Sequence, residues 1–472
     1  MRLRWMLFLI ALPIALHAQQ AGQLSALTKE FVRVSAPRVA LTHVRVIDGT
    51  GAAAKEDQTI ILVDGKIESI GPSGAATENA QVLDLAGRTV IPGLVGMHDH
   101  MFYPGGGGMF HEMGYSFPRM YLAGGVTTIR TTGSVEPYTD LELKKQIDSG
   151  AIPGPRMDVT GPYLEGPGTF AVQMHQLTSP EDARKTVEFW ADQGVTSFKA
   201  YNYLTRAELK AAVDAAHVRG IKLTGHLCSI GFHEAADLGI DGLEHGITVD
   251  TEFFSGKKPD LCPSPRAAVI EFSKMSIDDP RLQELINYLV SRHVAVTSTL
   301  PVFENFVAGR PALQQRVLDT MSEPAKVAYL NNRVSVSTSK DSPWPAMFQL
   351  EMQFERAFSQ AGGLLLAGLD PTGIGGDVAG FGDQREVELL VEAGFTPLQA
   401  IRIATSNGAE FMGLAGKIGT LAPGKSADLV VIKGDPSKKI EDIENVEIVF
   451  KDGVGYDPAK LLDSVRGRVG LN

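Results

Sequence analysis

The middle of the chain alternates between short apolar runs and longer amphipathic stretches, and this alternation constrains the fold more than any other feature. Each run is followed by a stretch with helical signals. The eight runs are Thr89–Met97, Val126–Thr131, Met157–Gly161, Val195–Ala200, Lys222–Gly225, Gly242–Glu244, Val294–Ser298 and Leu364–Gly368. Strands that alternate with helices form a parallel sheet with helical crossovers. Eight such units are what a closed barrel requires, so we predict an α/β fold of the (β/α)8, TIM-like barrel type.

The segments between these runs support the prediction of a (β/α)8 barrel. The stretch Thr205–Arg219 begins with a threonine that can cap a helix, carries Glu208 three positions later and ends before Gly220. This is the pattern of a capped amphipathic helix. Two other connections, Thr251–Arg292 and Leu300–Gly362, are longer than a simple crossover needs. We expect them to form lids or substrate loops over the barrel mouth.

Both flanks of the central region have a different pattern, which is typical of antiparallel strands. Val39–Val46 and Thr59–Ile70 alternate apolar and polar residues, the second around an Asp-Gly turn, and Ala427–Lys433 and Val446–Lys451 repeat the pattern near the other end. We therefore predict a small β-sandwich built from both flanks. The predicted division is residues 1–18 as a signal peptide, 19–91 and 413–472 as the sandwich, and 92–412 as the barrel.

The first residues have the layout of a secretory signal peptide. Arg2 and Arg4 precede the apolar run Trp5–Leu16, and the small residue Ala18 follows. The run falls short of the ~20 apolar residues that a spanning helix needs, and Pro13 interrupts it. We expect cleavage near Ala18, export to the periplasm or the medium, and no integral membrane segment in the mature chain.

Composition excludes several classes of protein. A chain with 44% hydrophobic and 21% charged residues is ordinary for a globular protein, so disorder and fibrous folds are poor interpretations. A net charge of -11 gives no broad basic surface for nucleic acid. Export would permit a disulfide between the only two cysteines, Cys228 and Cys262, but their separation in sequence does not say whether they meet. We expect two free thiols.

Residues that can bind a metal follow five of the predicted strands. His98 and His100 directly follow the first strand, and because they are two apart in extended chain they point to the same side. Each such residue alone has an ordinary structural explanation, but barrel enzymes build their sites at these strand ends. The other residues are Lys199 after the fourth strand, His226 after the fifth, His245 after the sixth and Asp370 after the eighth. Six such groups at one rim are hard to attribute to packing.

Three sequence segments add a resemblance to a known family. They are IPGLVGMHDH at 91–100, GGVTT at 124–128 and GTLAPGKSADL at 419–429. With these motifs the chain resembles the amidohydrolase superfamily, and within it the imidazolonepropionase-like and prolidase-like branch of Xaa-Pro or Xaa-Arg dipeptidase type. The resemblance implies that His98, His100 and Asp370 hold one metal, that His226 and His245 hold another, and that a carbamate on Lys199 bridges them. Zinc suits imidazole and oxygen ligands, although manganese, cobalt or iron bind the same groups.

The resemblance also implies an activity. A hydroxide between two metals would attack the amide carbonyl of a dipeptide or an N-acyl amino acid, with Asp370 as general base and then as general acid. Cyclic-amide and lactone hydrolysis use similar metals and remain alternatives. A one-metal deaminase would not need Lys199, and a ligand-binding relative without catalysis would not need all six groups.

Three further residues are candidates for substrate contact. Arg130 and Tyr201 each follow a barrel strand and could meet a substrate carboxylate, and His175 lies in the loop after the third strand. Ordinary hydrogen bonding at the rim is the alternative for Arg130 and Tyr201. Thr131 follows Arg130 where the branch often has an acidic residue, and Leu369 precedes Asp370 where relatives commonly have threonine. We therefore expect a small-molecule amide or peptide substrate without carrying over the side-chain specificity of prolidases, and the sequence is compatible with a homo-oligomer.

Overall fold

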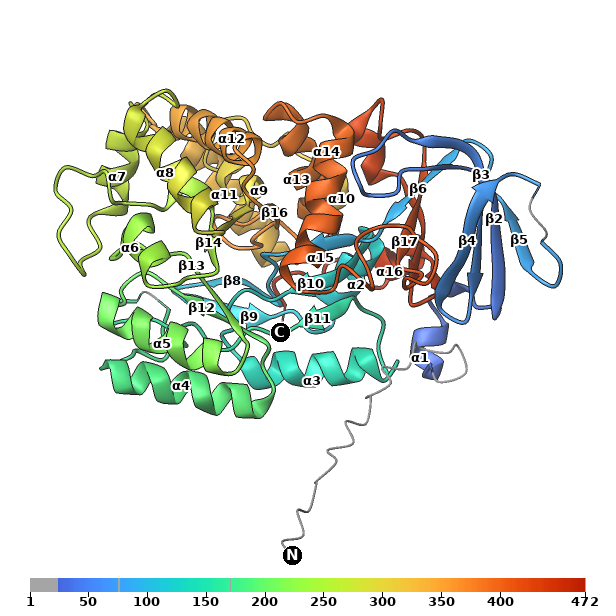
Figure 1. The fold of residues 1–472 in the computed structure, drawn as a ribbon, viewed down its shortest axis with the longest axis horizontal. Coiled ribbons are helices and arrows are strands. Elements are labelled where there is room, and N and C mark those ends of the chain that lie inside the picture. Colours follow the sequence, from blue (N-terminus) through green and yellow to red (C-terminus); the bar gives the residue numbers. More distant parts are fainter. Residues whose placement is uncertain (1–23, 75–76, 170, 472) are drawn as a thin grey trace, which may run out of the picture.

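A computed structural model describes residues 24–74, 77–169 and 171–471 of the chain. The predicted signal peptide, residues 1–18, lies outside the described residues. Figure 1 shows a central group of strands covered by helices on both sides, with a separate group of strands at one end of the molecule. Within the described part of the chain, no helix is long and apolar enough to span a membrane.

The elements have the following bounds. The strands are β1 Val32–Val34, β2 Arg38–Val46, β3 Lys55–Val63, β4 Lys66–Pro72, β5 Gln81–Asp84, β6 Arg88–Pro92, β7 Leu94–Gly96, β8 Phe102–Gly106, β9 Met109–Glu112, β10 Val126–Arg130, β11 Arg156–Asp158, β12 Ser197–Ala200, β13 Lys222–Gly225, β14 Gly242–Glu244, β15 Ala295–Ser298, β16 Leu365–Ala367, β17 Leu429–Lys433, β18 Val446–Lys451 and β19 Val454–Tyr456. The α-helices are α1 Ala26–Lys29, α2 Phe117–Ala123, α3 Pro137–Asp148, α4 Pro180–Gln193, α5 Arg206–Val218, α6 Phe232–Asp237, α7 Pro265–Phe272, α8 Pro280–Ser291, α9 Leu300–Glu304, α10 Gln315–Thr320, α11 Glu323–Thr338, α12 Trp344–Gln360, α13 Phe381–Glu392, α14 Pro397–Arg402, α15 Gly408–Phe411 and α16 Pro458–Asp463.

All eight predicted barrel strands form, as β7 and β10 to β16. They lie in two parallel sheets, one in the order β11-β10-β7 and one in the order β12-β13-β14-β15-β16. The two sheets meet at two seams. At the seam between β11 and β12 an isolated parallel bridge joins Thr160 to Ser197, and at the seam between β16 and β7 the amide of Met97 donates to the carbonyl of Ala367 at 2.8 Å. No single closed ladder is present among the described residues. The arrangement is therefore TIM-barrel-type α/β, with strand pairing interrupted at two places.

The helix that follows β12 shows why the crossovers form where the sequence predicted them. Thr205 caps α5: its hydroxyl accepts the amide of Glu208, and the Glu208 carboxylate accepts the amide of Thr205. This reciprocal pair satisfies backbone donors that a helix start otherwise leaves open. The helix packs against α4, and Figure 1 shows α3, α4 and α5 together along one side of the strands.

The two flanks of the chain pair with each other, as expected, but as one sheet. Its order is β1-β19-β18-β17-β6-β2-β3-β4, with β5 paired to β2, and β17 runs antiparallel to β6. The predicted turn at Asp64 and Gly65 joins β3 to β4, and both residues have positive φ, at 47° and 79°. A two-layer sandwich is not confirmed. One edge of β2 pairs with β3 along its whole length, and the other edge pairs first with β5 and then with β6. The pair of β6 and β17 joins the two flanks edge to edge.

The expectation of free thiols is wrong. Cys228 and Cys262 form a disulfide with their Cα atoms 4.9 Å apart, across a sequence separation of 34. The bond ties the loop after β13 to the long connection before α7. Sequence separation carries no information about such a distance, which depends on how that connection folds back over the strand ends.

Candidate metal centre

The six predicted metal-binding side chains gather at the carboxyl ends of β7, β12, β13, β14 and β16. His98, His100, Lys199 and His245 are at most 2% exposed and Asp370 is 8% exposed. Ring centroids of His98 and His245 are 4.4 Å apart, and those of His245 and His226 are 4.6 Å apart. Convergence of residues from distant parts of the chain, which the strand-end positions predicted, is therefore present in the structure.

Three of these residues form the tightest group. Asp370 Oδ1 lies 3.3 Å from His100 Nε2, and Asp370 Oδ2 lies 3.8 Å from His98 Nε2. One possible ligand atom from each of the three residues lies within 4.8 Å of the others. Two imidazole nitrogens and a carboxylate oxygen are a donor set that suits zinc and other divalent ions.

Hydrogen bonds to the outer ring nitrogens fix how the histidines face. His98 Nδ1 lies 2.8 Å from Glu244 Oε2, and His100 Nδ1 lies 2.7 Å from the carbonyl oxygen of Thr131. Because a carboxylate and a carbonyl only accept hydrogen bonds, each Nδ1 carries the proton and each Nε2 presents a lone pair to the site. Partners of this kind are those that orient metal-binding histidines.

His226 and His245 are also suited to binding a metal ion. His245 Nδ1 lies 2.7 Å from Thr299 Oγ1, and its Nε2 faces Asp370 Oδ2 at 3.9 Å. The buried Nδ1 of His226 has no hydrogen-bond partner among the described residues. Burial lowers the pKa of His226 to about 3 and that of His98 to about 4, which keeps both rings neutral. A neutral imidazole with a buried, unused nitrogen fits a metal ligand, because an unsatisfied polar atom is otherwise costly.

Lys199 lies beside this group instead of pointing to solvent. Its Nζ is 3.0 Å from His98 Nε2 and faces the rings of Tyr163 and Tyr201, with centroid distances of 5.4 and 5.8 Å. Burial lowers the pKa of the Lys199 amine to about 8. The amine therefore has an accessible neutral form, which is the form that can react with CO₂.

Asp370 is held as an ionised group. Burial alone would raise the pKa of its carboxyl, but His98 and His100 lower that pKa well below its ordinary value. The hydroxyl of Thr372 donates to Asp370 Oδ1 at 2.9 Å. The residue has a φ of 52°, a left-handed conformation that is rare outside glycine and that accumulates at functional sites.

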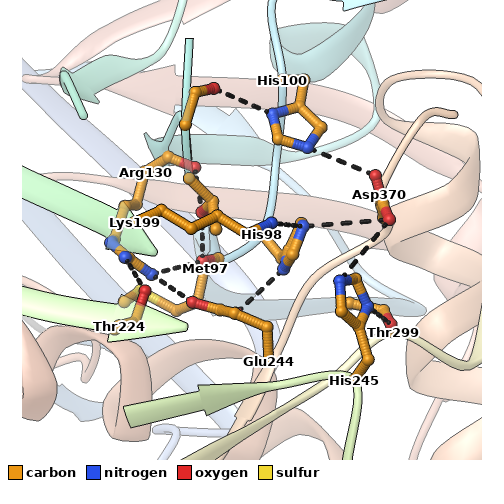
Figure 2. A network of polar contacts seen from close by, with 12 residues as sticks. Met97, His98, His100, Arg130, Lys199, Thr224, Glu244, His245, Thr299 and Asp370 are labelled. Carbon is orange, nitrogen blue, oxygen red and sulfur yellow. Dashed lines mark hydrogen bonds and ion pairs between the residues drawn. The ribbon is translucent and has the colours of Figure 1, made fainter. Parts of the chain in front are cut away.

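Glu244 is a residue of the site that the sequence did not reveal. Figure 2 shows its carboxylate between His98 on one side and Arg130 on the other. Arg130 Nη1 donates to Glu244 Oε1 at 3.0 Å, and Arg130 also donates to the hydroxyl of Thr224. The available signal was a charged residue within the buried strand β14, since such residues are seldom fully buried unless paired.

The three predicted substrate contacts have different outcomes. Arg130 is 1% exposed and is occupied by Glu244, so the structure places it behind the histidines and not at the cavity. The side chain of His175 is 55% exposed, lies 3.4 Å from Asp182 and does not line the cavity. Tyr201 does line it. Of the three, only Tyr201 is in a position to touch a substrate.

A cavity of about 370 Å³ opens above the metal-binding group, within the range of small-molecule sites. It is lined by His100, Phe102, Pro104, Gly106, Gly108, Met109, Phe110, Tyr163, Met174, Lys199, Tyr201, His226, His245, Val302, Phe303, Phe306, Asp370, Thr372 and Gly373. Val302, Phe303 and Phe306 come from the start of the connection at 300–362, for which a lid or substrate loop was predicted. The glycine run at 105–108 forms the tip of the β8–β9 hairpin beside the same opening.

Comparison with known proteins places the chain in a family. The model of the amidohydrolase family matches residues 89–257 and 305–455, more than half of the chain. The imidazolonepropionase of Stenotrophomonas maltophilia is 32% identical over 102 residues, which are 20% of this chain and 25% of that enzyme. The dihydroorotase of Pelotomaculum thermopropionicum is 35% identical over 85 residues, 18% of this chain and 19% of that enzyme. The matches thus span a quarter or less of these two relatives.

Solved structures match over a far larger share. The crystal structure of a candidate prolidase from Bifidobacterium longum is 26% identical, with a TM-score of 0.66 over 91% of this chain and 98% of that chain. A Xaa-Pro dipeptidase with methionine bound in its active site shares the fold, with a TM-score of 0.65, 20% identity and coverage of 89% of this chain and 100% of that chain. The chain therefore belongs to the amidohydrolase family, on the branch that includes imidazolonepropionase-like and prolidase-like proteins.

Proposed function

We propose that the protein is a metal-dependent hydrolase that cleaves an amide-type C–N bond of a small substrate. The observation that carries this proposal is the convergence of four neutral imidazoles, one buried lysine and one ionised carboxylate at the floor of a cavity. Membership of the amidohydrolase family supports the same activity.

The donor set fits two divalent ions, with zinc as the first choice. His98, His100 and Asp370 would hold one ion and His226 and His245 the other. When bound, such ions polarise a carbonyl and lower the pKa of water towards ~7. We propose that Lys199 joins both sites as a carbamate. As an ammonium, Lys199 would occupy the lone pair of His98 Nε2, 3.0 Å away, whereas a carbamate leaves that lone pair free and supplies two oxygens that share one negative charge.

Asp370 is the proposed proton carrier. Its ionised carboxylate can accept a proton from the attacking water and return it to the departing nitrogen, which leaves poorly as an unprotonated amide. The acyl carbon gains the hydroxyl of water, the C–N bond breaks, and the nitrogen leaves as an amine. The hydroxyl of Thr372 holds Oδ1 in place, so Oδ2 remains the more available oxygen for this transfer.

Dipeptides and N-acyl amino acids were the substrates expected from the sequence, and cyclic amides and lactones are the second candidates. The position of Lys199 within the metal-binding group favours hydrolysis over one-metal deamination. The test is turnover of metal-loaded protein against a panel of dipeptides, N-acyl amino acids, neutral amides, cyclic amides and lactones, followed by mass spectrometry, with Asp370→Asn as the inactive control. We expect the wild type to cleave an amide and the Asp370→Asn variant to cleave none. Deamination of an aminoheterocycle, or no cleavage anywhere in the panel, would contradict the proposal.

Further proposals concern the whole chain. We propose that residues 92–412 form one (β/α)8 barrel whose strands are continuous across both seams. Residues 19–91 and 413–472 are proposed to form the flanking β domain. Residues 1–18 are proposed to be a signal peptide that directs the protein to the periplasm or the medium. Amino-terminal sequencing of protein recovered outside the cytoplasm tests this: a chain that still begins at Met1 would contradict it.

A further inference from the structure

The upper wall of the cavity is almost entirely apolar. Its side chains come from the β8–β9 hairpin, from the loop after β11, and from α9 with the turn that follows it. They are Phe102, Met109, Phe110, Met174, Val302, Phe303 and Phe306. This wall lies above the polar floor formed by the histidines, Lys199 and Asp370. A substrate bound at the floor therefore extends into hydrophobic surroundings.

Part of this wall is a rigid aromatic surface. Trp344 stacks on Phe306 with ring centroids 4.7 Å apart and on Phe303 with centroids 5.8 Å apart, at interplanar angles of 19° and 20°. Phe303 also meets the ring of His245 edge-on at 5.6 Å. Stacked rings of this kind lose little conformational freedom when they bind a flat apolar group. The surface thus begins at the metal-binding floor and continues outward.

Among the described residues, the wall of the cavity has no cationic side chain that could pair with a substrate carboxylate. Among the described residues that line the cavity, Lys199 is the only lysine or arginine, and it lies against His98 in the floor. Arg130, for which a substrate contact was predicted, does not line the cavity and is paired with Glu244. Asp370 is the only acidic lining residue in the same described set. A free carboxylate placed against the wall would lose its hydration without gaining a partner, which is strongly unfavourable.

We propose that the substrate is an uncharged amide that carries an apolar, preferably aromatic, group and has no free carboxylate. This inference rests on the proposed function and narrows it, because it excludes dipeptides and N-acyl amino acids as the preferred class. The aromatic wall binds the apolar group, while the hydroxyl of Tyr201, which lines the cavity, is available to the polar amide.

A matched pair of substrates tests the inference. N-phenethylbenzamide and N-benzoyl-L-phenylalanine have the same scissile bond and the same rings and differ by one carboxylate. With metal-loaded protein we expect kcat/KM to be at least about tenfold higher for the uncharged amide. Calorimetric titration of the metal-loaded Asp370→Asn variant provides a second readout, in which the uncharged amide should also bind at least about tenfold more tightly.

A charge introduced at the wall should change this preference. Met109 lies on the hairpin and is 40% exposed, so Met109→Arg should fold normally. Its guanidinium should raise the ratio of carboxylate-bearing to uncharged turnover by roughly tenfold. Val218, which is 89% exposed on α5 behind the strands, provides the control: Val218→Arg should leave the ratio unchanged.

The outcomes separate the two proposals. If N-benzoyl-L-phenylalanine is cleaved or bound as well as the uncharged amide, the substrate class is overturned while amide hydrolysis stands. If neither compound is cleaved or bound, the apolar substrate class is also overturned, and the wider panel alone decides whether the protein hydrolyses amides. A ratio that Met109→Arg and Val218→Arg alter equally would show that the wall does not select by charge.

Discussion

Replacement of Glu244 by glutamine should damage both the stability of the fold and the binding of metal. The carboxylate is fully buried, lies 3.0 Å from Arg130 and accepts from His98 at 2.8 Å. At 3.0 Å a pair of unit charges interacts by about 5.5 kcal/mol for an effective dielectric constant of 20. Loss of one partner of a buried pair costs about 3–5 kcal/mol, because the other charge remains without compensation. We therefore expect Glu244→Gln to lower the free energy of unfolding by about 3–5 kcal/mol.

The same change should alter His98. The amide group of a glutamine at this position can donate to His98 Nδ1, which moves the ring proton to Nε2 and removes the lone pair that faces the site. Metal affinity should fall by roughly 10- to 100-fold, as expected when a partner that orients a ligand is lost. Denaturant unfolding of chelator-treated protein measures the stability, and titration with zinc against a competing chelator measures the affinity.

A double variant separates the two effects. Arg130→Met with Glu244→Leu removes both buried charges and should recover most of the stability, but it leaves His98 without its acceptor and should not recover metal affinity. Glu181→Gln is the control, because its pair with Arg184 is exposed and exposed pairs of this kind add little to stability. If Glu244→Gln were as stable as Glu181→Gln and bound zinc like the wild type, the reasoning about this buried network would be refuted.

Three further variants test other parts of the account. Replacement of Cys228 and Cys262 by serine should lower the free energy of unfolding by about 3–4 kcal/mol for a loop closed over 34 residues, measured by denaturant unfolding, and an unchanged midpoint would count against a structural disulfide. The hydrogen bond to Glu252 raises the pKa of His233 to about 9. The contribution of His233 to the free energy of unfolding is therefore complete below pH 6.5 and is lost as the pH rises through about 9. The loss in the free energy of unfolding caused by His233→Gln should therefore shrink between pH 6.5 and about pH 9 in denaturant unfolding curves. A loss that stays constant over this range would contradict the raised pKa. Thr205→Ala should cost about 1 kcal/mol through loss of the helix cap, with Thr205→Ser close to the wild type.

Much of the fold was predictable because its signals are local. The capping pair of Thr205 and Glu208, the Asp64–Gly65 turn and the eight barrel strands are each encoded within a few residues. The convergence of His98 with Asp370 was also predictable, although they are far apart in sequence. Parallel strands of a barrel all end at the same rim, so residues that follow different strands are brought together.

Other features depend on long-range contacts that the sequence pattern does not contain. The pairing of Arg130 with Glu244 determines that this arginine supports the histidines and does not reach a substrate. The disulfide depends on the path of a long connection, as does the position of Phe303 in the cavity wall. Strand patterns in the flanks identified the strands but not that the pairing of β6 with β17 would join them into one sheet.

The metal content of the purified protein tests the central claim most directly. Elemental analysis of the wild type grown with zinc should give about two ions per chain. Lys199→Ala should lower this number because both proposed sites lose a ligand, while the surface control Val218→Arg should not. Wild-type protein that binds no divalent ion, or Lys199→Ala protein that binds as much metal as the wild type, would contradict the account.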